Sequence, residues 1–219
     1  MPRIEPLTKD IAMYTPKAFS DSDTLQLQDL MDQTRLAILV TQGEDGLQAT
    51  HLPLLLNREQ GPNGTLYGHL AKANPQWRAL ENQTQALVIF PGGDAYVSPS
   101  FYPSKAEHEK VVPTWNYLAV HAYGQAEVFT DAERLHRLVG SLTEKHESRR
   151  AQPWSINDAP AEYIEKMLGA IVGFALPIES LQGKRKLSQN RSAPDIAGVR
   201  DGLAASHDPK DQEIARLMS

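Results

Sequence analysis

Residues 36–70 read LAILVTQGEDGLQATHLPLLLNREQGPNGTLYGHL, in which three short apolar runs are separated by two turn sequences. The runs cover residues 36–41, 47–56 and 65–70, and the turns are Gly-Glu-Asp-Gly and Gly-Pro-Asn-Gly. Runs of this length that are rich in aliphatic residues are typical of strands, and glycine and asparagine tolerate the positive φ that tight turns require. The stretch therefore predicts consecutive hairpins in an antiparallel meander.

Further strands are predicted at residues 86–90, 113–129 and 171–178. In the longest of these, one face carries tyrosine, alanine and histidine and the other carries aliphatic residues: Tyr117, Ala119, His121 and Tyr123 alternate with Leu118, Val120 and Ala122. Six or so strands with few long helices predict a closed or partly closed barrel, because closure removes exposed strand edges. The expected fold class is therefore mainly β with helices (α+β).

The clearest helix is predicted at residues 131–147, where Leu135, Leu138 and Leu142 share one face and Asp131 can cap the first turn. Other helices are predicted at residues 24–33, from Asn74 and Pro75 onward, at 160–170 and at 208–218. The chain of 219 residues suits one domain over residues 1–219, in which about 195–219 form a C-terminal helical extension.

Composition excludes several classes of protein. The chain has no cysteine, which rules out disulfides, thiolate metal sites and a cysteine nucleophile, and makes the cytoplasm the expected compartment. The N-terminal residues have no signal-peptide core, and no window approaches the ~18 apolar residues of a membrane span. The seven histidines lack metal-ligand spacing, so no metal site is expected. A net charge of −5 disfavours direct binding of nucleic acid.

Two segments near the predicted hairpins could form a ligand site. Residues 49–56 place His51, Leu52 and Pro53 in an apolar strand, where proline requires an edge, a bulge or a neighbouring ligand. Residues 68–77 pass from a strand into a helix start beside Lys72, which is an arrangement that can bind phosphate. A core strand with a satisfied histidine, and an ordinary capped helix with a solvated lysine, are the structural alternatives.

Two further segments have both a binding and a structural interpretation. Residues 98–105 and 110–117 gather aromatic rings, hydroxyls and prolines, which suit the wall of a planar-ligand pocket or a stiff loop that caps the barrel. Residues 182–191 carry four cations beside amide and hydroxyl groups and could contact a phosphate, a carboxylate or nucleic acid. A charge run of this kind is more often a solvated surface.

Taken together, these segments resemble the PaiB family of FMN-binding negative transcriptional regulators. The resemblance covers essentially the whole chain, through residues 13–19, 49–53, 68–77, 95–99, 102–105, 112–117, 146–147, 153–154, 170–173 and 186–190. It implies a flavin-reductase-like split β-barrel, also found in pyridoxamine-phosphate oxidases, with FMN as cofactor at a homodimer interface. Lys72 and Phe101 stand where arginine and tryptophan are common in the family.

The resemblance also implies roles for individual residues. The backbone around His51 and Leu52 would meet the polar edge of the flavin ring, and Lys72 with the helix start at Asn74 would hold the phosphate. Trp115 and Asn116, from the second subunit, and the segment of residues 186–190 would close the site. The complete set of expected FMN-binding residues is His51, Leu52, His69, Lys72, Asn74, Trp77, Trp115, Asn116, Lys186, Gln189 and Asn190; no catalytic residue is assigned.

Three functions remain open from the sequence. The resemblance favours a flavin-binding repressor that acts directly or through a partner, although no helix-turn-helix with a basic recognition helix is visible. The alternatives are an FMN-dependent oxidoreductase or flavin reductase, whose chemistry the flavin would supply, and a non-enzymatic flavin sensor. An enzymatic role is the less expected of these, and DNA is a weak candidate partner beside a second copy of the chain.

Overall fold

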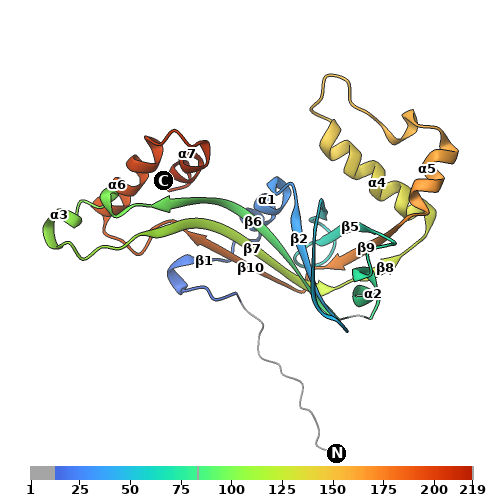
Figure 1. The fold of residues 1–219 in the computed structure, drawn as a ribbon, viewed down its shortest axis with the longest axis horizontal. Helices are drawn as coiled ribbons and strands as arrows, with labels where there is room; N and C mark the ends of the chain where they lie inside the picture. Colours follow the sequence, from blue (N-terminus) through green and yellow to red (C-terminus); the bar gives the residue numbers. More distant parts are fainter. Residues whose placement is uncertain (1–12, 83, 219) are drawn as a thin grey trace, which may run out of the picture.

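The computed structural model describes residues 13–82 and 84–218, which fold into two antiparallel sheets (Figure 1). A six-stranded sheet has the order β1-β10-β7-β6-β2-β3, and a four-stranded sheet has the order β4-β5-β9-β8. The strands are β1 (Ser20–Asp21), β2 (Ala37–Gly43), β3 (Gly46–Leu52), β4 (Leu55–Asn57), β5 (Thr65–Ala71), β6 (Gln85–Val97), β7 (Thr114–Gln125), β8 (Glu127–Phe129), β9 (Ile171–Pro177) and β10 (Ser180–Lys186).

The helices lie between and after these strands. They are α1 (Thr24–Gln33), α2 (Gln76–Glu81), α3 (Lys105–His108), α4 (Ala132–Glu147), α5 (Ala161–Leu168), α6 (Ala193–Ala204) and α7 (Pro209–Arg216), with short 3₁₀ turns at Lys17–Phe19, Pro99–Phe101 and Ile156–Asp158. Within the described residues, no helix is long and apolar enough to span a membrane. The expectation about a signal peptide concerns residues 1–19, of which the first twelve lie outside the described part of the chain.

The chain closes the barrel by passing four times from one sheet to the other: at Pro53 between β3 and β4, through α2 between β5 and β6, at Ala126 between β7 and β8, and after Pro177 between β9 and β10. The prediction of single strands over residues 47–56 and 113–129 was therefore wrong. Proline cannot donate a ladder hydrogen bond, so the strand ends at Leu52 and resumes at Leu55 in the other sheet. The two turns are as predicted, with positive φ at Gly46, Gly61 and Gly64.

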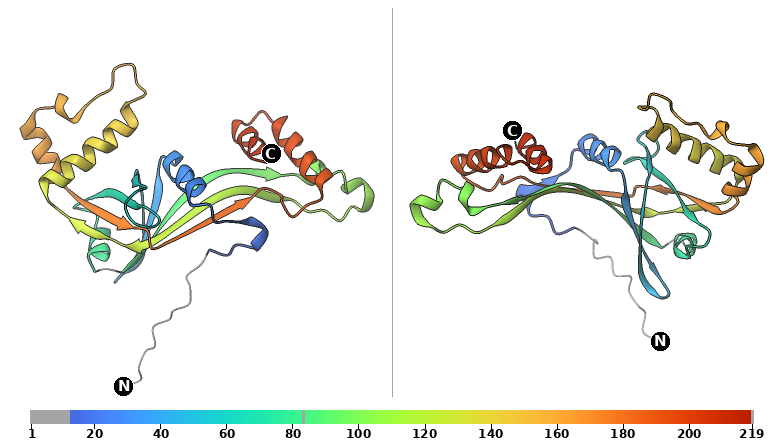
Figure 2. Two further views of the ribbon diagram at one scale, coloured as in Figure 1. Left: turned by 180° about the vertical axis from the view of Figure 1, so that it is seen from behind. Right: turned by 45° about the horizontal axis from the view of Figure 1, so that its top comes forward.

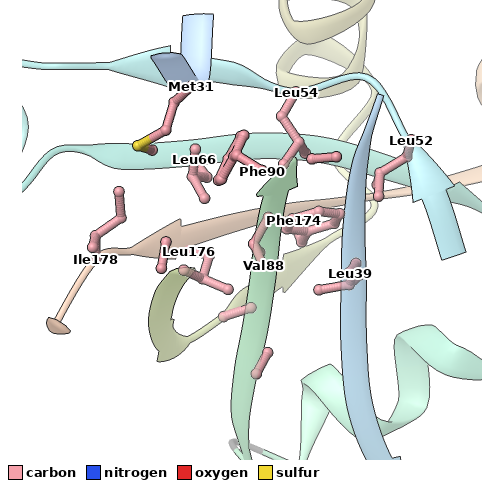
Figure 3. Packing of buried hydrophobic residues seen from close by; sticks show 14 of the residues in the cluster. Met31, Leu39, Leu52, Leu54, Leu66, Val88, Phe90, Phe174, Leu176 and Ile178 are labelled. Atoms are coloured by element: carbon pink, nitrogen blue, oxygen red, sulfur yellow. The ribbon is translucent and has the colours of Figure 1, made fainter. Parts of the chain in front are cut away.

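Side chains from both sheets fill the space between them (Figure 3). Leu39, Val88 and Phe90 from the six-stranded sheet pack with Leu66, Phe174 and Leu176 from the four-stranded sheet, and Met31 of α1 joins them. Each is almost completely buried. Burial of one such side chain stabilises the fold by roughly 1.5–3 kcal/mol, so this shared core holds the two sheets together.

The predicted helices are confirmed to within about two residues at most ends, and both α4 and α1 have a side-chain cap at the start. Asp131 accepts a hydrogen bond from the Arg134 N–H (2.8 Å) at the start of α4, and Asp23 caps α1. Leu135, Leu138 and Leu142 of α4 pack with Leu168 of α5 over the outer face of the four-stranded sheet.

The β6–β7 hairpin extends beyond the barrel as an arm, and α6 and α7 pack on one face of it (Figures 1 and 2). A bulge between Pro91 and Asp94 lets β6 continue into the arm. At Gly92 a Cβ would lie 2.7 Å from Leu118 Cβ and 3.0 Å from the Leu118 carbonyl oxygen, so only glycine fits there. The strand β10 was not predicted from the sequence, and the charged residues 183–186 belong to it. The helix α6 lies largely within the expected helical extension over about 195–219, although it was not predicted as a separate helix.

Candidate functional site

A hydrogen-bond network ties the edge strand β3 to the loop between β5 and α2. The Thr50 hydroxyl donates to Gln76 Oε1 (2.5 Å), and the Asn74 amide donates to Thr50 Oγ1 (3.0 Å). Gln76 is buried, and its Nε2 donates to the carbonyls of Leu39 and Gln48. Since these buried polar groups satisfy one another, the network fixes Asn74 next to the backbone of β3.

Lys72 lies at the end of β5, beside the end of α5. Its backbone N–H donates to the Ala170 carbonyl (2.8 Å), and its Nζ donates to the Gly169 carbonyl (2.7 Å). The carbonyl of Lys72 accepts a hydrogen bond from Trp77 Nε1 (3.1 Å), so Trp77 supports the backbone of the loop. An ammonium has three donors, and the exposed Lys72 side chain keeps two for a ligand.

The start of α2 offers fewer free N–H groups than the sequence suggested. Asn74 Oδ1 accepts the Gln76 N–H (3.1 Å), and the Arg78 N–H donates to the Pro75 carbonyl (3.0 Å). The helix also spans only Gln76–Glu81, which limits its dipole. Charge for a phosphate at this position therefore comes from Lys72 more than from the helix.

His51 and Leu52 point to opposite sides of β3. The His51 side chain is exposed on the outer face of the six-stranded sheet, whereas Leu52 lies in the barrel core (Figure 3). Leu52 can therefore meet a ligand only through its backbone. β3 is an edge strand, so part of its backbone has no partner strand in the described chain.

His69 lies on the face of β5 that also carries Tyr67, which packs against the residues under α4. Its Nδ1 is buried and has no hydrogen-bond partner among the described residues. Burial lowers the pKa of the His69 imidazole below its ordinary value of about 6.5. The structure thus places His69 under the helical layer, apart from the exposed Lys72 side chain.

The lowered pKa of His69 predicts acid sensitivity in the flavin-free protein. The unfolded chain takes up this proton at a higher pH than the folded chain, so the stability is fully present above pH ~6.5 and falls as the pH drops towards the folded pKa. Urea unfolding at pH 7.5 and pH 5.5 should show a smaller loss of unfolding free energy for His69→Gln than for the unmodified protein. Equal losses would contradict a neutral, buried His69.

The second group of predicted residues lies on the arm. Trp115 is 52% exposed and meets the Tyr96 ring edge-on, with the ring centroids 5.7 Å apart. The Lys186 Nζ donates to Thr114 Oγ1 (2.7 Å) and to the Trp115 carbonyl. Burial, Lys184 and Arg191 lower the pKa of Lys186. An exposed ring beside a partly buried cation suits a planar anionic ligand.

Asn116, Gln189 and Asn190 differ in accessibility. Asn116 is completely buried, and its amide is engaged by Ser188 and Met218. Gln189 and Asn190 are exposed, and Gln189 Oε1 accepts the Leu187 N–H (2.7 Å). A direct contact between Asn116 and a ligand therefore requires rearrangement, whereas Asn190 is accessible as it stands.

The two groups are far apart within one chain. His51, Ile38, Ile89, His121 and Gln182 form one cross-strand row over five strands, from β3 to β10. The four steps between neighbouring strands place Gln182 ~19 Å from His51 across the sheet. Lys186 lies four residues further along β10, which adds ~13 Å in the direction of the strand. About 23 Å along the sheet thus separates His51 from Lys186, which is too far for one flavin ring to contact both.

His51 from the first group, and Trp115 and Lys186 from the second, border the same outer face of the six-stranded sheet. The middle of that face is aliphatic, and none of its side chains is buried within the described chain: Ile38, Val40, Ala49, Leu87, Ile89 and Ala119. Leu47, at the edge, is 76% exposed. A contiguous apolar face of this kind is typical of an interaction surface.

Sequence reasoning missed Thr50, Gln76 and Met218, which position the predicted residues, and it included Ser188 only as a member of the segment of residues 186–190. The residue types alone do not reveal these roles, because the roles depend on contacts between segments far apart in the sequence. Thr50 and Gln76, for example, are 26 positions apart. The capping pattern of Asn74 before α2 was the one local sign of the network.

Comparison with known proteins identifies the family. A family model described as "Putative FMN-binding domain" matches residues 13–180. This chain belongs to that family. It is 35% identical over 206 residues to the "Protease synthase and sporulation protein PAI 2" of Bacillus subtilis (strain 168), with 94% of this chain and 96% of the relative covered. Membership of the PaiB family, and FMN as its cofactor, are thereby confirmed.

Other relatives and solved structures agree with the family and the fold. An uncharacterized protein of Aspergillus fumigatus is 35% identical over 236 residues, covering 87% of this chain and 90% of its own. The flavocytochrome Anf3 from Azotobacter vinelandii has a TM-score of 0.55 at 18% identity, covering 89% of this chain and 75% of its own. The FAD and heme binding protein from Mycobacterium smegmatis has a TM-score of 0.55 at 19% identity, with coverage of 81% and 78%. The predicted split-barrel fold is confirmed.

Proposed function

We propose that this PaiB-family protein binds FMN in two identical sites, each shared between two copies of the chain. FMN combines a phosphate with a planar ring whose edge carries hydrogen-bonding groups. The chain supplies matching chemistry in two places: the Lys72 ammonium beside the β3 edge, and the exposed Trp115 ring beside Lys186. The donor set therefore fits the cofactor, although the separation of about 23 Å prevents one chain from using both groups on one flavin.

A two-fold dimer through the aliphatic sheet face would resolve this separation. In a two-fold interface, residue i of one chain meets residue j of the other, and j meets i. If the two-fold axis crosses the face midway between the groups, the His51 end of each chain lies over the Trp115 end of the other. The dimer then contains two equivalent composite sites. The observation that carries the proposal is that His51 at one end, and Trp115 and Lys186 at the other, border one uncovered apolar face.

In this arrangement each residue has a stated part. Lys72, with Asn74 held by Thr50, would bind the phosphate, and the β3 backbone at His51 and Leu52 would face the ring edge. Trp115, Lys186, Gln189 and Asn190 of the second chain would cover the ring. The flavin supplies redox chemistry when bound, and the protein supplies its orientation and its shielding from water.

A regulatory role is the second part of the proposal, and it rests on the name of the Bacillus subtilis relative, which refers to protease synthesis and sporulation. The cations of residues 184–186 are engaged within the chain: Lys184 Nζ donates to the Tyr14 carbonyl, and Arg185 lies 3.9 Å from Asp21. Because these cations are partnered, we place regulation of transcription through a partner protein ahead of direct DNA binding. The cytoplasm remains the proposed compartment.

Titration of flavin-free protein with FMN tests the proposal directly. Quenching of flavin fluorescence should saturate at one FMN per chain, and light scattering should give twice the chain mass of 24.3 kDa. A monomer that binds FMN at the same stoichiometry would contradict the shared site. A DNA shift assay at two salt concentrations separates the two modes of regulation, since phosphate contacts weaken steeply with salt.

A further inference from the structure

The carboxamide of Asn116 joins three segments of the chain inside the C-terminal part of the fold. Ser188 Oγ donates to Asn116 Oδ1 (3.1 Å), and Asn116 Nδ2 donates to Met218 Sδ (3.5 Å). Ser188 and Met218 are themselves buried, and Asn116 is 0% exposed. These hydrogen bonds stabilise the amide in its buried position, because an unpaired buried amide would lower the stability of the fold.

Ser188 has an unfavourable backbone conformation that needs support. Its φ is 66°, in the left-handed region that residues other than glycine rarely adopt. Two bonds shape the turn locally, from the Leu187 N–H to Gln189 Oε1 (2.7 Å) and from the Arg191 N–H to the Ser188 carbonyl (2.9 Å). The hydroxyl bond to Asn116 is the side-chain link from this turn to β7.

The other end of the link is fixed by the C-terminal helices. Ile214 and Met218 pack with Val199 and Leu203 against Ala95 and Val97 of the arm. The Phe101 ring packs over Gly202, where a Cβ would lie 2.4 Å from it. Ser104 Oγ donates to Asp195 Oδ2 (2.9 Å), which fastens the arm loop to α6. The family match ends at residue 180, so Ser188, α6 and α7 all lie beyond it.

We propose that Asn116 is a positioning residue, through which the C-terminal helices hold residues 187–190 in the conformation that presents Gln189 and Asn190 to the flavin. This inference rests on the proposed function and gives Asn116 a role without flavin contact. The Ser188 hydroxyl is its partner, and Met218 fixes the amide orientation, because a thioether can only accept a hydrogen bond.

Two variants test the link, each measured with and without flavin. Asn116→Ala removes the amide, and Ser188→Ala removes only the hydroxyl, so it keeps the packing if the first variant folds poorly. Both should raise the FMN dissociation constant about ten-fold, the effect of one lost hydrogen bond in a buried network. In flavin-free protein, both should speed hydrogen exchange of the Leu187 and Arg191 amides.

Ser206→Ala is the matched control. The Ser206 hydroxyl donates to Asp211 Oδ2 (2.7 Å) between α6 and α7, in the same part of the fold but away from Asn116. This variant should leave both FMN affinity and the exchange of residues 187–191 unchanged.

The outcomes separate this inference from the proposed function. Faster exchange together with weaker FMN binding in both variants supports the link. Faster exchange with unchanged FMN affinity would overturn it, because the turn would then lie away from the flavin. Unchanged exchange in Ser188→Ala would overturn it as well. In either case the shared site is tested separately, by the stoichiometry of FMN binding and the mass of the FMN-bound protein.

Discussion

Replacing Lys72 by alanine should weaken FMN binding roughly ten- to a hundred-fold and leave riboflavin binding almost unchanged. A charge-assisted hydrogen bond contributes about 1.5–3 kcal/mol, and riboflavin lacks the phosphate that would receive it. The structure supports this role, because the Lys72 ammonium keeps two donors beyond its bond to the Gly169 carbonyl. Fluorescence titration with the two ligands measures the difference in one experiment.

Lys145→Ala is the control for this prediction. Lys145 Nζ also donates to a backbone carbonyl, that of Leu54 (3.1 Å), and it lies on α4, away from the β5 end. The substitution should change stability and leave the affinity for both flavins intact. If Lys72→Ala weakened riboflavin as much as FMN, the lysine would act on the ring or on the fold, and the phosphate would have to bind elsewhere.

Much of the fold follows from local patterns in the sequence. Alternation in residues 114–123 predicts the two faces of β7, and the burial of Leu118, Val120 and Ala122 agrees with it. Glycine at positive φ marks both hairpin turns, and Asp131 marks the start of α4. These features depend on neighbours a few residues away, so one sequence is enough to find them.

The strand β10 was missed because its pairing partners, not its own pattern, make it a strand. Residues 182–186 are polar and charged, which is typical of a solvated surface. In the structure, Lys184 lies over the rings of Tyr14 and Tyr117 at 5.6 and 5.3 Å, and Arg185 faces Asp21. Aromatic and acidic neighbours from distant segments take the place of an apolar core, and periodicity cannot reveal them.

In the candidate site, too, some features follow from the local sequence and others depend on contacts between distant segments. The sequence names His51, Trp115 and Lys186, but it cannot show that His51 lies about 23 Å from Lys186 along one sheet face. Nor can it show that Asn116 is buried while Trp115, the preceding residue, is exposed by half. The alternation of a strand predicts that neighbours differ, and only the packing of α7 decides which of them is covered.

A dimer mixed from two defective chains should recover one of its two flavin sites. One chain carries Lys72→Ala and the other carries Lys186→Ala with Asn190→Ala; each pure variant dimer has both sites damaged. If each site takes Lys72 from one chain and Lys186 and Asn190 from the other, the mixed dimer has one site with all three changes and one site with none.

Two affinity tags allow the mixed dimer to be purified after co-expression, and FMN titration then counts its tight sites. We expect one FMN per dimer to bind with the affinity of the unmodified protein, against none in either pure variant. If each site were built from a single chain, the mixed dimer would contain no intact site, and its titration would equal the average of the two variants. That result would overturn the shared site while leaving Lys72 as a phosphate ligand, because the two conclusions rest on different observations: the separation along the sheet for the first, and the donors of one lysine for the second.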